Sequence, residues 1–424
     1  MNEVKEQIGE LLKQELGVHG RKILEEFLED KKDGMIRKSL EELEDHVYKE
    51  LKSEYGIERA EEVVDRIKKV RLLRQLEGLR ERKESKVKYR SMYEVLKELG
   101  DVCLNLNQLE EAEEHFEEML KVSEKAERKK MIIDSLKSQA ELYLVLDELD
   151  KVEDNVKRMI ELAKRSGEEV MEGEGIKLAG IVSWRRGDHR EAVNYLKNSL
   201  EIFKDRGLKQ RMASVYRELG DLYVGEDNYE KGLNFYKGAA RNFGDSEMPY
   251  ERVNMLLEIG MILSEEAKTD EAIEFLEMAE EECLENSFPD LMAWSSLNLG
   301  ETYLEEGEIE KAEEKLNKAE ELFEKVEDEH GKGGSLLKYG ELLTEEGELP
   351  EGERALKEAL DVFRRLGLSR SEAETRYRLA EVQRKRGAFD RAETNLEEAL
   401  KICDSLDISE MKEEIEEKLA DLTK

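Results

Sequence analysis

A small residue recurs every 40 residues along this chain, and that period constrains the fold more than any other feature of the sequence. Eight successive places hold Gly or Ala: Gly100, Ala140, Gly180, Gly220, Gly260, Gly300, Gly340 and Ala380. A fixed period of this kind arises when one supersecondary unit cannot bury its apolar face alone and stacks on copies of itself. The sequence therefore predicts an array of internal repeats.

Three further ladders share the period. A mostly small ladder runs from Ala112 to Ala392, a mostly large apolar one from Phe116 to Leu396, and a last one ends in Ala at Ala399. Small residues allow two helices to cross closely, and large apolar residues fill the space between them. Turn-forming residues lie between the two predicted helices of a repeat, at Asn107, Asp147, Gly187, Asp227, Gly307, Gly347 and Gly387. The unit is predicted to be helix, turn, helix.

These motifs resemble the tetratricopeptide repeat, whose first helix carries L-G-x-x-Y and whose second carries A-x-x-x-F and a further Ala. Leu219-Gly220 with Tyr223, and Leu299-Gly300 with Tyr303, match the first part. The resemblance covers residues 93–412 and implies an all-α fold, a right-handed α-solenoid (superhelix) of eight helix-turn-helix repeats. The family's usual period is about 34 residues, so the surplus lies after the second helix and lengthens the flanking helices.

The remaining segments flank this array. Residues 1–64 form a predicted helical N-terminal extension of no recognised family, with breaks near Gly17, Gly20 and Gly34. Residues 65–92 are predicted to be a basic helix leading into the solenoid, because residues 66–90 hold 11 Lys or Arg against 3 Glu. Residues 413–424 are predicted to form a capping helix. The basic helix either docks on the acidic repeats or contacts an anionic partner such as nucleic acid.

Composition narrows the class of partner. The formal net charge of −35 repels a phosphate polyanion, so nucleic-acid binding by the whole molecule is not expected. No apolar run reaches the length of a membrane span, and the first ten residues are polar. A soluble cytoplasmic protein with no membrane association is predicted. Its three cysteines, Cys103, Cys283 and Cys403, are expected to be buried and reduced.

Catalytic and cofactor motifs are not recognisable. The glycines of Gly173-Glu174-Gly175 and of residues 331–334 lack the preceding strand that a phosphate-binding loop needs. The five histidines show no metal-ligand spacing with each other or with cysteine. The sequence therefore predicts a protein that is not an enzyme, with no cofactor and no metal.

A binding groove is what the resemblance implies instead. In such repeats the fifth, sixth, ninth and twelfth residues of the first helix face inward. With Gly100 as the eighth residue, the fifth positions are first basic and then apolar: Lys97, Lys137, Lys177 and Arg217, followed by Leu257, Leu297, Leu337 and Tyr377. Asp101, Glu141 and Asp221 stand one turn beyond three of these cations and are expected to pair with them.

The second half of the groove is the predicted partner-binding region. Its other candidate residues are Met261, Asn298, Leu304, Lys338 and Arg378. Trp184 and Trp294 also fall on the inward register, either as groove anchors or as core between neighbouring helices; both interpretations remain open.

The predicted function is a non-catalytic scaffold or adaptor that binds a peptide or helix of another protein. The alternative is a signalling or transcription-related regulator whose N-terminal helices respond to groove binding. A nucleic-acid-associated factor that uses residues 66–90 is a third possibility. The sequence names neither the partner nor the oligomeric state.

Overall fold

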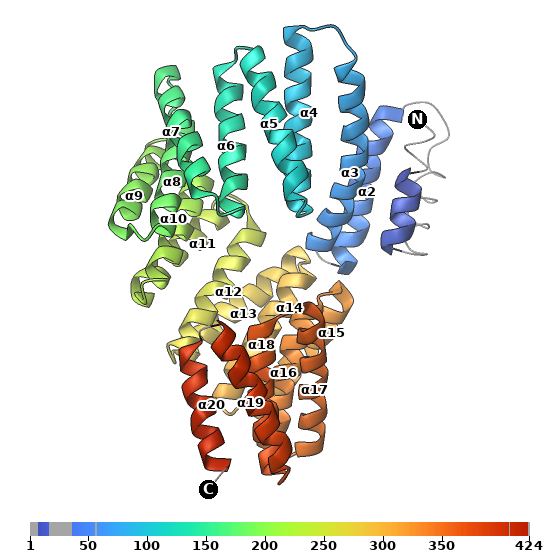
Figure 1. Ribbon diagram of the computed structural model, residues 1–424, viewed down its shortest axis with the longest axis vertical. Helices are drawn as coiled ribbons and strands as arrows, with labels where there is room; N and C mark the ends of the chain where they lie inside the picture. Colours follow the sequence, from blue (N-terminus) through green and yellow to red (C-terminus); the bar gives the residue numbers. More distant parts are fainter. Residues whose placement is uncertain (1–6, 17–35, 56, 407, 423–424) are drawn as a thin grey trace. The chain divides into compact units, whose positions relative to one another are not determined.

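The computed structural model describes residues 7–16, 36–55, 57–406 and 408–422, which are helices joined by short turns with no strand among them (Figure 1). By internal contacts the chain divides into two compact units, residues 1–53 with 57–255 and residues 54–56 with 256–424. Within the described part, no helix combines the length and the apolar character that a membrane span requires.

Eight helix-turn-helix pairs follow one another along the chain. In the first unit they are α4 (Lys86–Asn105) with α5 (Leu109–Lys125), α6 (Lys129–Val145) with α7 (Leu149–Ser166), α8 (Glu169–Arg185) with α9 (His189–Asp205), and α10 (Lys209–Val224) with α11 (Tyr229–Gly244). Helix α12 (Pro249–Glu265) contains the boundary between the units and precedes α13 (Thr269–Asn286). The second unit continues with α14 (Pro289–Glu305) and α15 (Ile309–Val326), α16 (Glu329–Glu346) and α17 (Leu349–Leu366), and α18 (Ser369–Lys385) and α19 (Phe389–Leu406), followed by α20 (Ser409–Leu422). The three prolines all lie in the first turn of a helix, where the missing N–H has no helical partner to lose.

The turns are more regular than the sequence indicates. All seven predicted turn residues have left-handed backbone conformations, and Ala267 takes the same conformation at the one place where no turn former stands. A second set lies midway, between one repeat and the next, so a left-handed residue occurs every 20 residues from Asn107 to Gly387. In the first turn Gln108 N donates to Cys103 O at 2.8 Å, and the equivalent bond recurs in later turns. This six-to-one bond is the Schellman motif that ends a helix.

The 40-residue ladders form the contact between the two helices of each repeat. The first-ladder residue faces the third-ladder residue, as Gly220 faces Tyr236 and Gly300 faces Leu316. A Cβ atom placed on Gly180, Gly220, Gly260, Gly300 or Gly340 would lie 2.5–2.9 Å from the facing side chain, which is closer than van der Waals contact. Ala112 and Ala319, from the second and fourth ladders, are fully buried. The helices therefore approach as closely as the small residues permit.

The N-terminal part differs from the prediction in its boundaries. Residues 65–92 are not one helix, because α3 (Ile57–Arg80) ends before a short loop and α4 begins at Lys86. The break follows from Ser85, whose side chain accepts a hydrogen bond from Lys88 N at 3.1 Å and caps α4. Helix α3 also crosses the expected boundary at residue 64, and α20 begins at Ser409. The expected breaks at Gly17, Gly20 and Gly34 lie outside the described residues.

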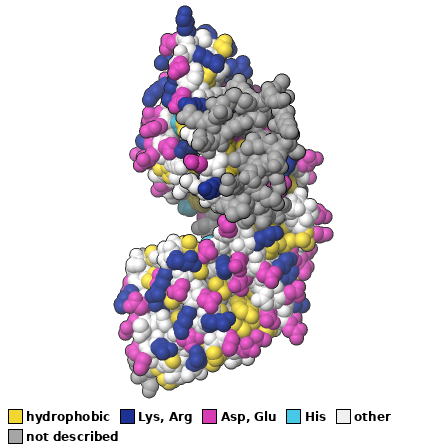
Figure 2. All heavy atoms as spheres, turned by 90° about the vertical axis from the view of Figure 1, so that its right-hand side faces the viewer, with side chains coloured by type: hydrophobic (Ala, Val, Ile, Leu, Met, Phe, Trp, Pro, Cys, Tyr) yellow, Lys and Arg dark blue, Asp and Glu magenta, His cyan; other side chains and the backbone are white. Residues whose placement is uncertain are grey.

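Acidic residues of the neighbouring helices surround the basic side chains of α3. Arg71 pairs with Glu44 of α2 (Ile36–Tyr55) at 2.8 Å and with Glu98 of α4 at 3.1 Å. Lys69 pairs with Glu111 at 2.8 Å, and Arg80 pairs with Glu118 at 2.5 Å, both on α5. On the face drawn in Figure 2, Lys and Arg side chains are interspersed with Asp and Glu rather than gathered in one patch. The α3 part of the basic segment thus docks on acidic helices of its own chain through Lys69, Arg71 and Arg80.

The close contact at the helix crossing predicts the outcome of a matched pair of substitutions. Gly220→Ala places a methyl group against the Tyr236 ring, whose hydroxyl is held by Asp221 at 2.6 Å, so the ring has little freedom to move. We expect a loss of about 1–3 kcal/mol in the free energy of unfolding. Gly78→Ala in α3, where no atom lies within 4 Å of the added carbon, should instead stabilise by about 0.5–1 kcal/mol. Urea denaturation of both variants decides the matter; equal effects would mean that the ladder does not set the helix spacing.

The Arg71 ion pair predicts how firmly α2 is held. Glu44 is 5 % exposed, and burial raises the pKa of its carboxyl although Arg71 opposes the shift. Arg71→Met leaves this carboxyl buried without its cation, and we expect a loss of roughly 3 kcal/mol with faster amide hydrogen exchange across α2. The control is Lys121→Met, which removes an exposed pair with Glu117 and should cost less than about 1 kcal/mol. Unchanged exchange in α2 would rule out this docking role.

Candidate functional site

The inward positions of the first unit carry paired charges. Lys137 pairs with Glu141 at 2.7 Å, as the spacing predicts. Lys177 is held by Glu174 at 3.3 Å and donates to Ser214 Oγ at 3.2 Å. The side chains of Lys137 and Lys177 are 29 % and 14 % exposed. Both cations are therefore neutralised by a carboxylate and partly covered by neighbouring residues.

Two of the expected pairs do not form. Arg217 contacts Glu218 at 3.4 Å, whereas Asp221 accepts a hydrogen bond from the Tyr236 hydroxyl at 2.6 Å. The reason is the neighbouring second helix, which the one-turn spacing rule does not include. Among the described residues, no carboxylate lies within ion-pair distance of Lys97, but its charge still opposes the burial that raises the pKa of Asp101.

Glu174 is the charged centre of this face. It is 4 % exposed and lies between Lys177 and Arg211. Burial disfavours its charged form, but the surrounding cations Lys177, Arg211 and Lys137 outweigh burial, so the pKa of the carboxyl is lowered. The sequence analysis noted Glu174 only for its flanking glycines.

The inward positions of the second unit are less exposed than an open apolar stripe would be. Leu257 and Leu297 are each 6 % exposed, Leu337 is 4 % exposed and Tyr377 is 9 % exposed. A Cβ atom on Gly334, in the following first helix, would lie 3.3 Å from a methyl group of Leu297, so neighbouring first helices cover these side chains. Leu304 is also buried, at 8 %. Met261 is the exposed apolar side chain of this set, at 44 %.

Both tryptophans are partly buried against neighbouring helices. Trp294 makes an edge contact with Phe323 of α15, with ring centroids 5.0 Å apart, and lies 5.6 Å from the ring of His330. Trp184 packs on the cluster around Leu219 and lies beside Gly225 at the end of α10. Each ring therefore contributes to packing and keeps part of its surface in solvent.

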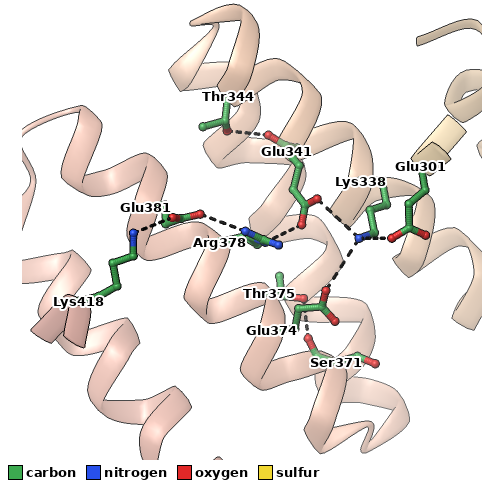
Figure 3. A network of polar contacts seen from close by, with 11 residues as sticks. Glu301, Lys338, Glu341, Thr344, Ser371, Glu374, Thr375, Arg378, Glu381 and Lys418 are labelled. Atoms are coloured by element: carbon green, nitrogen blue, oxygen red, sulfur yellow. Dashed lines mark hydrogen bonds and ion pairs between the residues drawn. The ribbon is translucent and has the colours of Figure 1, made fainter. Parts of the chain in front are cut away.

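A network of ion pairs crosses the inward face of the second unit (Figure 3). Lys338 of α16 contacts Glu301 of α14 at 2.6 Å, Glu341 at 3.6 Å and Glu374 of α18 at 4.0 Å. Arg378 contacts Glu341 at 2.8 Å and Glu381 at 3.3 Å, and Lys418 of α20 reaches Glu381 at 3.6 Å. The network joins four successive first helices.

Electrostatics distinguish the members of this network. Burial disfavours the charged form of Lys338, but Glu341 and Glu301 outweigh it and raise the pKa of the ammonium group. Burial raises the pKa of the Glu341 carboxyl, although Lys338 and Arg378 oppose the shift. Burial also raises the pKa of Glu305. Carboxylates with raised pKa values favour the arrival of a further cation.

A pocket of about 250 Å³ opens onto this network. Its wall includes Leu304 and Thr344 beside five carboxylates and three cations. The charged lining residues are Glu301, Glu305, Glu341, Glu345, Glu381, Lys338, Arg378 and Lys385. On helix α14, which contributes to the pocket, the side-chain amide nitrogen of Asn298 is buried and has no hydrogen-bond partner among the described residues, but Asn298 is not part of the pocket lining. The pocket thus combines an excess of acid with a smaller apolar contribution from Leu304 and Leu356.

Sequence reasoning named Lys338 and Arg378 but not their acidic partners. Glu301, Glu341 and Glu381 recur at the ninth position of successive repeats. That 40-residue spacing was the signal available to find them, but Glu is so frequent in this chain that the pattern did not stand out.

Comparisons with known proteins agree with the repeat fold. Tetratricopeptide-repeat profiles match residues 295–326 and 334–405, and the profile of the soluble NSF attachment protein family, SNAP, matches residues 105–297. These matches support a tetratricopeptide-repeat protein, and the fold is an all-α helical-repeat solenoid. No curated protein sequence matches significantly.

Solved structures share the fold at low sequence identity. The apo form of RapI is 14 % identical, with a TM-score of 0.59 over 79 % of this chain and 97 % of that one. A signal transduction ATPase with numerous domains (STAND) that carries a tetratricopeptide repeat sensor, from Pyrococcus horikoshii, is 15 % identical, with a TM-score of 0.60 over 97 % of this chain and 74 % of that one. Aspartyl phosphate phosphatase F from Bacillus subtilis is 14 % identical, with a TM-score of 0.52 over 88 % and 96 %.

The lowered pKa of Glu174 gives a pH-dependent prediction. A carboxyl whose pKa is lower in the folded state stabilises the fold above its unfolded pKa of about 4.5 and loses that contribution as the pH falls through the folded value. Glu174→Gln should therefore cost about 1–3 kcal/mol at pH 7, and the difference from the native protein should shrink below pH 4.5.

Denaturation curves at pH 7 and at lower pH test this expectation. Glu161→Gln is the matched control, because Glu161 pairs with Arg165 where both side chains are more than half exposed. A destabilisation by Glu174→Gln that does not depend on pH would show that packing, not charge, holds this residue.

Proposed function

We propose that the protein is a non-catalytic scaffold that binds an extended peptide or helix of a partner protein on the inward face of its second unit. The observation that carries the proposal is the pocket lined by the first helices α14, α16 and α18 and by Leu356 of α17, which combines two leucines with an excess of carboxylates. Peptides that bind in helical-repeat grooves use this combination of apolar anchors and charge complementarity.

The charge of the pocket defines the ligand more closely. Five carboxylates face three cations, and two of the carboxylates, Glu305 and Glu345, are exposed at the pocket. An acidic peptide tail would meet repulsion here, whereas Lys or Arg in the ligand would be attracted. The proposed ligand is therefore a segment with one apolar and one basic side chain in proximity. Met261, the exposed methionine of the same inward register, offers a further adaptable apolar contact.

The unused Asn298 donor supports the same mode of binding. A buried amide nitrogen without a partner costs free energy that a ligand carbonyl oxygen recovers on binding. Asn298 occupies a sixth position, one repeat before Lys338. A peptide backbone supplies such oxygens at regular intervals, which a compact small molecule does not.

The N-terminal helices give the regulatory alternative a structural basis. Helix α3 pairs with the first repeat through Lys69, Arg71 and Arg80, so a change in that repeat would be felt by α3. The same pairs argue against nucleic-acid binding through Lys69, Arg71 and Arg80, because a phosphate would have to displace the carboxylate that each of them already contacts.

Peptide selection tests the proposed binding mode. The full chain is panned against a random peptide library, and we expect enriched peptides with Lys or Arg beside an apolar residue. Glu305→Gln/Glu345→Gln should weaken binding of these peptides about tenfold or more, which corresponds to about 1.4 kcal/mol. Both residues are exposed, and a glutamine at position 305 can still accept the hydrogen bond from Ser264, so we expect the fold to be retained.

The matched control neutralises two exposed carboxylates of α15, Glu314→Gln/Glu321→Gln, and should leave binding unchanged. An equal loss of binding in both double variants would show that the net charge of the protein, and not the pocket, causes the loss. Enrichment of acidic peptides would overturn the assignment of the ligand.

A further inference from the structure

The first repeat brings three metal-ligand side chains together from two helices. The Cys103 sulfur of α4, a carboxylate oxygen of Glu111 and a ring nitrogen of His115, both of α5, all lie within 4.8 Å of one another. Sequence spacing did not indicate this group, because Cys103 comes from a different helix and a three-residue turn folds it back beside the other two. Thiolate, imidazole and carboxylate are the ligands that zinc prefers in proteins.

Side chains at the equivalent positions of other repeats are also in contact with one another. In the second, fourth and sixth repeats, the places of Cys103 and Glu111 hold Tyr and Lys, and the ammonium group lies 4.5–5.2 Å from the ring centre. The place of His115 is also adjacent: Phe235 stacks on Tyr223 at 5.4 Å, and Asn395 donates to Gln383 at 3.0 Å. The first repeat therefore replaces a structural contact with three potential ligands at a position where side chains converge.

The environment favours a bound cation. Nε2 of His115 is buried and has no hydrogen-bond partner in the part of the chain described. Cys103 is fully buried, while the Glu111 side chain is 50 % exposed and keeps the site open to solvent. Lys69 of α3 contacts the same Glu111 carboxylate at 2.8 Å, so an ammonium group already occupies part of the cation position. Arg80, the other nearby cation, is neutralised by Glu118.

We propose that Cys103, Glu111 and His115 bind one zinc ion, with water in the fourth position. Ligands of tetrahedral zinc lie about 3.3–3.8 Å apart for bonds of roughly 2.0–2.3 Å, so side-chain rotations of about an ångström close the site. Binding converts the Cys103 thiol to a thiolate and releases its proton to solvent. Because the bound ligand is the thiolate, zinc affinity rises with pH. The ion and Lys69 compete for Glu111, and zinc binding weakens the contact between α3 and the first repeat.

Cobalt substitution provides the direct test. Titration of the metal-free full chain with Co²⁺ should give one equivalent of binding with a thiolate-to-cobalt charge-transfer band, and Zn²⁺ should remove the band. Cys103→Ser should abolish the band. His115→Asn introduces the residue found at the same place in the second and eighth repeats, and should lower zinc affinity at least roughly tenfold while the fold is kept.

Two further variants make the result decisive. Glu111→Lys introduces the residue that stands at this place in the second, fourth and sixth repeats and should also prevent binding. Cys403→Ser, at a buried cysteine of α19, should bind zinc as the native chain does. Circular dichroism of each variant confirms that the helices are intact. A band that survives Cys103→Ser, or equal zinc affinity in His115→Asn and the native chain, would overturn the proposal.

Discussion

The close approach of the two helices in each repeat is the contact on which the rest of the structure depends. It exists because Gly or Ala on the first helix leaves room for a large side chain on the second, such as Phe116 opposite Gly100. The same register then fixes everything else on the first helix. Once the eighth residue faces its partner helix, helical geometry also fixes the directions of the fifth, sixth and ninth residues. The inward charges are therefore a geometric consequence of a packing rule.

Charge on the inward faces is balanced locally although the chain is strongly acidic. In the first unit one buried carboxylate, Glu174, lies among several cations, whereas in the second unit buried cations such as Lys338 lie among several carboxylates. Removing any one member leaves a partly buried charge without its counterpart, which costs more than the pair contributes. The two faces consequently differ in the sign of the buried charge at their centre.

The sequence was sufficient for the fold because packing repeats and therefore leaves a periodic signature. The period, the helix-turn-helix unit and the contact ladders could be read from the sequence, but the second set of left-handed turns, between one repeat and the next, could not. The candidate site was less accessible for two physical reasons. Leu297 and Leu337 lie on the inward register, but register does not report how deeply the next helix covers a side chain. Asp221 shows the second reason, since its bond to Tyr236 comes from a helix that local spacing ignores.

In the N-terminal region, the sequence pattern did not predict where one helix ends and the next begins. The charge run from Arg66 to Arg90 was correctly identified as basic, but net charge along a segment does not reveal a helix end. Ser85 marked that end, and a single capping residue is a weak signal within a charged stretch. Three ligand atoms brought together across the turn after α4 were likewise invisible to linear spacing.

The left-handed residue every 20 positions has a consequence for how such a chain can change its length. Because all the turns share one conformation, a segment cut out between any two turns leaves ends that can be joined in the same turn geometry. Loss or duplication of 40 residues would preserve the alternation of inner and outer helices. Loss of 20 would place an outer helix in an inner position, with its small residues facing no partner. Gain and loss of whole repeats is thus the natural step by which this architecture can be lengthened or shortened, and a graft from a related protein should begin and end at equivalent turns.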